Sequence, residues 1–274
     1  MGAEQPGEAS VTAIVVTHNS ADVLAACLDS LGRQIACRVI VVDNASSDAT
    51  LGIVRRRSGV QLLSLEDNAG YSAANNRGLA LVQTPFVLFV NPDAFLDDQN
   101  VLACLLGFLL QHPQAAAAGP QLVKPDGSIQ PFAFGSDPSP RYMLWRALYR
   151  LLLRRPLHDW ATTREQRADW VSGACLLART DAVRDVGGWD TAFFMYFEDS
   201  DLCRRLRTWG WEIWYVPSVR IVHAGGQTDY SDVRRRQMYY ESLVCYHRKH
   251  SGRPTQIALA CLLRPYMWLT GMNR

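Results

Sequence analysis

The strongest constraint on the fold is a repeated pattern in the first 125 residues, where short apolar runs alternate with amphipathic segments. Runs rich in Val, Ile, Leu and Phe predict strands at 11–19, 38–46, 60–66 and 85–91. Helical patterns follow them at 20–34, in a segment through Val54, at 71–83 and at 100–112. Continuously apolar strands that alternate with helices are typical of a parallel sheet covered on both faces. The sequence therefore predicts an α/β fold with a mostly parallel sheet flanked by helices.

Each of these predicted strands ends in polar side chains. They are Thr17, His18 and Asn19 after the first strand, Asp43 and Asn44 after the second, Asn68 after the third, and Asn91 and Asp93 after the fourth. Ligands of such sheets bind beyond the carboxyl ends of the strands. We therefore expect these side chains to face one crevice.

The pattern changes after residue 125. We expect a turn at 124–130, a basic amphipathic helix at 141–155, a strand at 170–179, a short helix at 181–188, two short strands around Pro217 within 212–226, and a helix at 234–250.

Charge and cysteine usage narrow the function classes. The formal net charge is only +2, so no strong field draws the whole molecule to nucleic acid, and no nucleic-acid partner is expected. Seven cysteines without a CxxC pair favour reduced thiols and a cytoplasmic location. No stretch reaches the ~20 uninterrupted apolar residues of a membrane span.

The segment Asn91-Pro92-Asp93 places a carboxylate at a strand tip. Mg²⁺ and Mn²⁺ prefer oxygen ligands, so one such carboxylate together with a substrate diphosphate could hold the ion. The alternative is a simple turn. Asp43, at another strand end, could accept a hydrogen bond from a ring N–H of a base, or else it caps the following helix.

The segment 68–78 combines small and polar residues. Gly70 would let the backbone approach a ligand, Asn75 adds an amide, and Arg77 could meet phosphate oxygens. The segment is not GxGxxG, and the chain has no GxxxxGK[ST]. Neither a dinucleotide fold of the usual kind nor a P-loop is predicted.

The segment 196–205 concentrates acidic residues beside aromatic ones. Glu198, Asp199 and Asp201 fall within four residues, a setting that raises carboxyl pKa values and suits a general base. The structural alternative is that acids in a first turn stabilise the helix, with Asp201 and Arg205 paired at i, i+4. His223 ends an apolar strand, where it is either a partly buried core residue or a metal ligand.

Taken in order, these segments resemble the inverting family-2 glycosyltransferases of the GT-A fold. The resemblance covers about residues 11–226 and rests on AIVVTHNSADVLAACLDSL, VIVVDNASSDAT, NAGYSAANNRG, FVLFVNPDAFL, WVSGACLLARTDAVRDVGGWDTAFFMYFEDSDLCRRLR and VRIVHAGG. The sequence is most similar to a rhamnosyltransferase-like branch, typified by enzymes that place L-rhamnose on polyprenyl-diphosphate-linked N-acetylglucosamine.

The resemblance implies a role for each matching residue. It assigns nucleotide-sugar binding to Thr17, Asn19, Asp43, Asn44, Asn68, Gly70, Asn75, Arg77, Asn91, Trp189 and Asp190. Asp93 and His223 would hold a divalent cation, Mg²⁺ or Mn²⁺, with Asn91 replacing the first Asp of the family's DxD motif. Asp199 would be the catalytic base, with Glu198 as its acidic partner.

The resemblance also implies a domain organisation and a reaction. A catalytic GT-A domain would span 10–226, with a nucleotide-binding half at 10–125 and an acceptor-binding half at 126–226, followed by a C-terminal helical segment at 227–274. The reaction would move a sugar, with L-rhamnose from dTDP-L-rhamnose as the expected donor among dTDP- and UDP-sugars, to a lipid-linked saccharide. Other sugar donors, nucleotidyl transfer and non-catalytic nucleotide-sugar binding stay open as alternatives.

A lipid-linked acceptor suggests work at the inner face of the plasma membrane. The helix at 141–155 and the C-terminal Tyr266 and Trp268 could lie in a membrane surface. The alternative is that these helices pack on the core or on another subunit, as in a homodimer.

Overall fold

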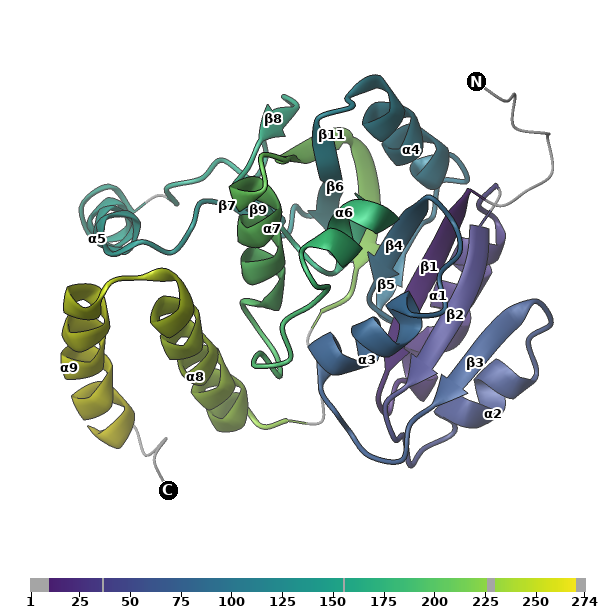
Figure 1. The fold of residues 1–274 in the computed structure, drawn as a ribbon, viewed down its shortest axis with the longest axis horizontal. Coiled ribbons are helices and arrows are strands. Elements are labelled where there is room, and N and C mark those ends of the chain that lie inside the picture. Colours follow the sequence, from purple (N-terminus) through teal and green to yellow (C-terminus); the bar gives the residue numbers. More distant parts are fainter. Residues whose placement is uncertain (1–9, 36, 155, 226–229, 270–274) are drawn as a thin grey trace.

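A computed structural model describes residues 10–35, 37–154, 156–225 and 230–269 (Figure 1). Within these residues nine strands form one sheet in the order β3-β2-β1-β4-β10-β6-β11-β5, with β8 paired to β11. Their bounds are β1 Val11–Thr17, β2 Cys37–Asp43, β3 Val60–Ser64, β4 Phe86–Val90, β5 Ala94–Phe95, β6 Ala115–Val123, β8 Gln166–Arg167, β10 Cys175–Arg179 and β11 Glu212–His223. A smaller sheet pairs β7 (Phe134–Gly135) with β9 (Trp170–Val171).

The sheet is mostly parallel, as the sequence predicts. β1 runs parallel to β2 and β4, β2 to β3, and β6 to β11, whereas β10 lies antiparallel between β4 and β6. Strands β1 and β4 are buried along their whole length, because helices flank the sheet. The four helices of the first half are α1 Ala21–Gly32, α2 Thr50–Arg55, α3 Tyr71–Leu79 and α4 Val101–Gln111. The predicted α/β fold is confirmed.

The sequence did not reveal β6. Its first four residues are alanines, which favour strands weakly, and Gly119-Pro120 reads as a turn. In the structure β6 is buried between β10 and β11, and only a small residue fits at Gly119, where a Cβ would lie 2.7 Å from Cβ of Val171. Tertiary burial overrides local propensity here.

The two strands expected around Pro217 are one strand. β11 runs from Glu212 to His223, and its pairing with β6 shifts register between Val216 and Arg220. This irregularity accommodates Pro217, which has no N–H to donate to the ladder. The expectation of two strands was therefore wrong.

Within its described residues, the second half has five helices and one π-helical turn. They are α5 Pro140–Leu148, η1 Tyr149–Leu153, α6 Thr180–Asp185, α7 Glu198–Thr208, α8 Asp232–His250 and α9 Arg253–Leu269. In Figure 1, α5, α8 and α9 lie at one end of the molecule, far from β1–β3. None of the helices, over the residues described, is long and apolar enough to cross a membrane. The expected domain boundary at 226/227 lies outside the described residues.

Candidate active site

The carboxyl ends of β1 and β2 bring Thr17 and Asp43 together. The two residues are register partners in the parallel pair, and both are fully buried. Thr17 Oγ1 donates to Asp43 Oδ1 at 3.1 Å, and the Ser46 N–H donates to Asp43 Oδ2 at 3.1 Å. These bonds hold the Asp43 carboxylate at the sheet edge in one orientation.

Asparagine side chains connect the loops that follow the first three strands. Asn44 Nδ2 donates to Asn68 Oδ1 at 2.7 Å, and Asn44 Oδ1 accepts from the Ala69 N–H at 2.9 Å. Asn19 has a left-handed φ of 48°, and its Oδ1 accepts from the Ser47 N–H at 2.8 Å. The three asparagines thus give this edge of the sheet a defined shape.

Gly70 permits a close approach between two segments of the site. Its φ is 84°, and a Cβ there would lie 2.7 Å from a ring carbon of Phe194. The next residue, Tyr71, begins α3 and donates its N–H to the Phe194 carbonyl at 3.1 Å. On the same helix Asn75 is buried, whereas Arg77 is exposed in the last turn.

The two residues expected to hold a metal lie side by side. Asp93 Oδ1 is 3.3 Å from His223 Nε2, and both side chains are about nine-tenths buried, at 9% and 11% exposed. The short strand β5 makes this contact, because Ala94 pairs with His223 in β11 and the Ala224 N–H donates to the Asp93 carbonyl at 2.9 Å. Asp93 and His223 are 130 residues apart in the chain, so only the fold joins them.

The surroundings of His223 fit a divalent cation. His223 Nδ1 lies 3.1 Å from Gln130 Oε1, a carbonyl oxygen that only accepts, so we assign the ring proton to Nδ1. Nε2 would then offer its lone pair to a cation shared with the Asp93 carboxylate. Within the described residues no group of three or more His, Cys, Asp or Glu side chains could hold a metal. The remaining ligands of such an ion would have to come from substrate and water.

The acid pair Glu198 and Asp199 begins α7 in a strained backbone. The two residues before it, Tyr196 and Phe197, have left-handed φ values of 70° and 63°. Each such non-glycine residue costs on the order of 1–3 kcal/mol, and strain of this kind clusters at functional sites. The surrounding contacts hold this turn in place: the Ser242 hydroxyl donates to the Met195 carbonyl at 2.7 Å.

The two acids differ in their hydrogen bonding. Asp199 Oδ2 accepts from the Gly173 N–H at 3.1 Å, and Oδ1 accepts from the Ser200 N–H at 2.6 Å. Glu198 Oε2 is enclosed and has no partner among the described residues. Burial, and then the neighbouring Asp199, raise the pKa of Glu198 to about 8. Burial also raises the pKa of Asp199, although its hydrogen bonds act in the opposite direction.

Hydrogen bonds tie the acid pair to the end of β4. The Asn91 N–H donates to the Ala174 carbonyl at 3.0 Å, and the adjacent Gly173 donates to Asp199. The Tyr71 hydroxyl donates to the Gly173 carbonyl at 2.9 Å. The segment 173–174 therefore joins the acid pair, the start of α3 and the Asn91–Asp93 segment at one edge of the sheet.

Two residues expected near the sugar have structural contacts. Trp189 is 1% exposed and packs edge-on against Tyr71 and Phe89, with ring centroids 5.5 and 4.9 Å away. Asn76 binds its backbone, accepting from the Trp189 N–H at 2.8 Å and donating to its carbonyl at 2.7 Å. Asp190 pairs with Lys249 at 2.5 Å. These contacts give Trp189 and Asp190 a supporting place beside the site.

Sequence reasoning missed Tyr71, Gln130 and Gly173, and it singled out Asn76 without giving it a role. Gln130 lies in a segment that reads only as a turn, and Gly173 acts through its backbone, which any residue shares. The polar run around Tyr71 and Asn76 was a signal of a site, but it did not indicate which side chains face inward.

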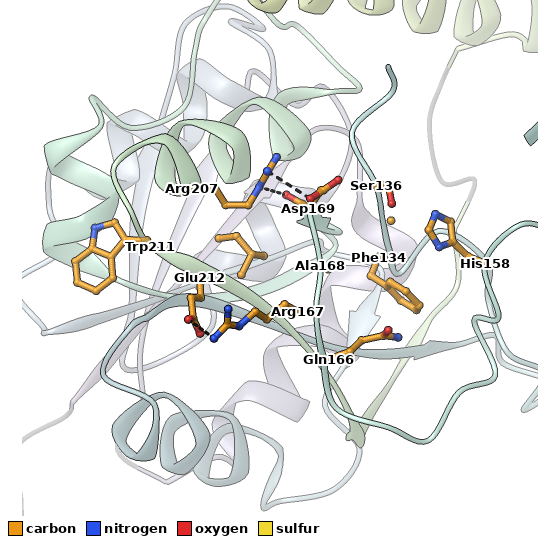
Figure 2. A pocket seen from close by; sticks show the side chains of 12 residues that line it. Phe134, Ser136, His158, Gln166, Arg167, Ala168, Asp169, Arg207, Trp211 and Glu212 are labelled. Atoms are coloured by element: carbon orange, nitrogen blue, oxygen red, sulfur yellow. Dashed lines mark hydrogen bonds and ion pairs between the residues drawn. The ribbon is translucent and has the colours of Figure 1, made fainter. Parts of the chain in front are cut away.

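A separate cavity of about 400 Å³ lies at the other end of α7 (Figure 2). Arg207 is paired with Asp169 at 3.4 Å and Arg167 with Glu212 at 2.5 Å along its wall. α7 has 11 residues, so about 16 Å of helix separates this cavity from the acid pair. The cavity is therefore not part of the candidate active site.

The mostly parallel sheet, with polar strand ends and an acid pair at one edge, defines a GT-A-type glycosyltransferase fold. Solved structures share it. A mannosyltransferase from Pyrobaculum calidifontis, solved with GDP-Man and Mn²⁺, gives a TM-score of 0.63 at 22% identity, covering 98% of this chain and 74% of that one. TarS from S. aureus gives a TM-score of 0.55 at 18% identity, covering 87% of this chain and 72% of that one.

The chain belongs to glycosyltransferase family 2, since the family described as "Glycosyltransferase like family 2" matches residues 6–241. It is 35% identical over 214 residues to the N-acetylglucosaminyl-diphospho-decaprenol L-rhamnosyltransferase of Mycobacterium tuberculosis, covering 71% of this chain and 68% of that protein. It is 27% identical over 225 residues to rhamnosyltransferase WbbL of Escherichia coli, covering 77% of this chain and 81% of that protein. The protein is therefore a glycosyltransferase.

Proposed function

We propose that the protein transfers L-rhamnose from dTDP-L-rhamnose to N-acetylglucosamine linked through a diphosphate to a polyprenol, with inversion at the anomeric carbon. The likeness to an N-acetylglucosaminyl-diphospho-decaprenol L-rhamnosyltransferase, at 35% identity over 71% of the chain, supports the sugar and the acceptor. The observation that carries the chemistry is the acid pair at the sheet edge, tied to the end of β4 through Gly173 and Ala174.

In this proposal Asp199 is the general base. It removes the proton of the attacking acceptor hydroxyl, a contribution of roughly 10²–10⁴-fold. The Gly173 and Ser200 N–H groups orient its carboxylate and favour its charged form. The carboxylate does not bond to the sugar, so a single displacement inverts the configuration.

The donor lies along the ends of β1–β4 in this proposal. Asp43 binds the pyrimidine ring, the strand-end asparagines and Gly70 surround the nucleoside and sugar, and Arg77 approaches phosphate oxygens. Asp93 and His223 would hold a divalent cation. When bound, the cation stabilises the negative charge of the departing nucleoside diphosphate.

A lipid-linked acceptor requires access to a membrane surface. We place the protein at the cytoplasmic face of the membrane, attached through an apolar and basic surface on α5 and η1. We define this surface as Leu144, Trp145, Leu151, Leu152 and Leu153, with the exposed Arg141, Arg146 and Arg154 beside them.

The test is a panel of dTDP-, UDP- and GDP-sugars, with Mg²⁺ or Mn²⁺, assayed with a synthetic diphosphate-linked N-acetylglucosamine acceptor. We expect release of dTDP and formation of an inverted rhamnoside. Release from another nucleotide sugar would reassign the donor. Pyrophosphate release from a nucleoside triphosphate would indicate nucleotidyl transfer, and binding without release would indicate a non-catalytic module.

The variant Asp199→Asn tests the base directly. It keeps the size of the side chain but cannot take a proton, so kcat should fall by about 10²-fold or more. Donor affinity, measured by calorimetry, should stay close to that of the unaltered protein. Turnover near the unaltered rate would rule out Asp199 as the base.

A further inference from the structure

A second, shallow cavity open to solvent lies on the side of α8, where it reaches Tyr196, two residues before the acid pair. Its volume is about 340 Å³, and it is lined by Tyr196, Asp232, Arg235, Arg236 and Tyr239. Four of these residues come from the first two turns of α8, and Tyr196 comes from the strained turn before Glu198. We propose that this cavity binds the diphosphate group of the acceptor; this inference rests on the glycosyl transfer proposed above.

The cavity adjoins the catalytic groups through Tyr196. This residue is two positions before Glu198, and its ring lies 6.0 Å from the ring of Tyr239. Burial raises the pKa of Tyr196, while Arg235 lowers it and Glu198 raises it. Tyr196 therefore lines the cavity with Arg235 and lies two residues before Glu198 in the chain.

The segment 194–197 separates this cavity from the donor edge. On one side the Phe194 carbonyl accepts from the Tyr71 N–H of α3 at 3.1 Å. On the other side the Phe197 ring lies 5.0 Å from the ring of Tyr239 on α8. In Figure 1 this segment accordingly runs between α3 and α8. Two diphosphates, one from each substrate, can thus lie on opposite sides of the acid pair.

The charges of the cavity suit a diphosphate. Two arginines face one carboxylate, so the lining carries a net positive charge. Arg235 is paired with Asp232, whose side chain is 73% exposed, and an exposed pair of this kind is weak. A diphosphate carries more charge than a carboxylate, and it accepts the paired N–H bonds of a guanidinium group. Tyr196 and Tyr239, which also line the cavity, each carry a hydroxyl that can donate a hydrogen bond.

The test compares two acceptors with the same sugar, one an alkyl diphosphate and the other a neutral alkyl glycoside. With the double variant Arg235→Ala/Arg236→Ala, KM for the diphosphate acceptor should rise about 10-fold or more. KM for the neutral acceptor, KM for the donor and the rate of donor hydrolysis by water should not change. Arg234→Ala is the matched control, because Arg234 lies on the same helix outside the cavity and pairs with Glu241 at 3.8 Å.

An unchanged KM for the diphosphate acceptor would overturn the inference, and so would an equal rise for both acceptors. Calorimetric binding of an alkyl diphosphate without sugar gives a readout that is independent of transfer: the double variant should lose binding and Arg234→Ala should keep it. If the unaltered protein shows neither donor hydrolysis nor transfer, the proposed function fails, and this binding difference still tests the cavity.

Discussion

At the scale of single residues, the adjacent acids Glu198 and Asp199 have opposite surroundings. Asp199 accepts hydrogen bonds from Gly173 and Ser200, whereas Glu198 Oε2 is enclosed without a partner in the described part of the chain. Hydrogen bonds favour a charged carboxylate and unpaired burial disfavours it. When the pair holds one proton, that proton lies on Glu198 and leaves Asp199 ready to accept another.

This assignment predicts how stability depends on pH. The folded-state pKa of Glu198 is about 8, against a reference value of 4.5, so between these values the folded protein holds a proton that the unfolded chain releases. The free energy of unfolding therefore falls as pH rises through this window. Glu198→Gln should flatten the decline and raise Tm above that of the unaltered protein at pH 8 and higher. Tm measured across a pH series checks this.

Glu241→Gln is the control for this measurement, since the Glu241 side chain is 49% exposed on α8. Its Tm curve should follow that of the unaltered protein. If Glu198→Gln also gave a parallel curve, the high pKa of Glu198 would be refuted.

At the scale of helices, Asp201 joins α7 to α8. It is fully buried, and its oxygens contact Arg205 of α7 and Lys249 and His250 of α8, each at 2.7 Å. Burial alone would raise the pKa of Asp201, but the His250 hydrogen bond, the charge of Arg205 and the Lys249 hydrogen bond together lower it to about 2. From the sequence, Asp201 could belong to a catalytic acid cluster or could pair with Arg205 and stabilise the helix. Its contacts in the structure favour the stabilising role.

Asp201→Asn should therefore destabilise the protein. The variant leaves three basic groups around a neutral side chain. Breaking a buried ion pair in this way lowers the free energy of unfolding by about 3–5 kcal/mol. The effect should be present above pH 3.8 and disappear as pH falls toward 2, where the native carboxylate is protonated as well. Urea denaturation at several pH values measures it.

Asp29→Asn is the matched control, because the Asp29 side chain is 52% exposed in its pair with Arg57. Exposed pairs contribute little, so its unfolding midpoint should hardly move. A similarly small shift for Asp201→Asn would show that α8 is held by its apolar contacts alone.

At the scale of the whole molecule, the surface on α5 and η1 is unusual. Leu151, Leu152 and Leu153 are 76%, 72% and 56% exposed, although amphipathic helices usually bury their apolar face. Arginines at 141, 146 and 154, on the same helical segment, are also exposed. An apolar and basic surface of this kind fits an anionic bilayer. The side chains of Tyr266 and Trp268, which the sequence also suggested, lie outside the described residues.

Replacing Leu151, Leu152 and Leu153 by serine should abolish flotation of the full chain with anionic lipid vesicles. The physical reason is the loss of apolar area, worth about 1.5–3 kcal/mol per fully buried leucine. Leu110→Ser is the control, because Leu110 is also exposed, at 59%, but lies on α4. Equal flotation of all variants would count against membrane attachment. A dimer that dissociates only in the serine variant would identify a subunit interface instead.

The sequence by itself determined the fold class and the polar residues that follow the strands at one edge of the sheet. Apolar runs alternating with helical patterns leave few ways to bury the core, and the residues at 17–19, 43–44, 68 and 91–93 follow their strands directly in the chain. Such patterns can be read from the sequence alone, because the spacing of apolar residues and the residues that follow a strand are local properties of the chain.

Only the tertiary structure decided which distant groups meet. The contact of Asp93 with His223, the support of His223 by Gln130, and the hydrogen bond from Gly173 to Asp199 join residues 130, 93 and 26 positions apart. The buried alanine strand β6 and the left-handed turn at Tyr196–Phe197 also contradict local propensity. The physical reason is that packing and hydrogen bonding among separate segments offset local costs of about 1–3 kcal/mol, which a single stretch of sequence does not reveal.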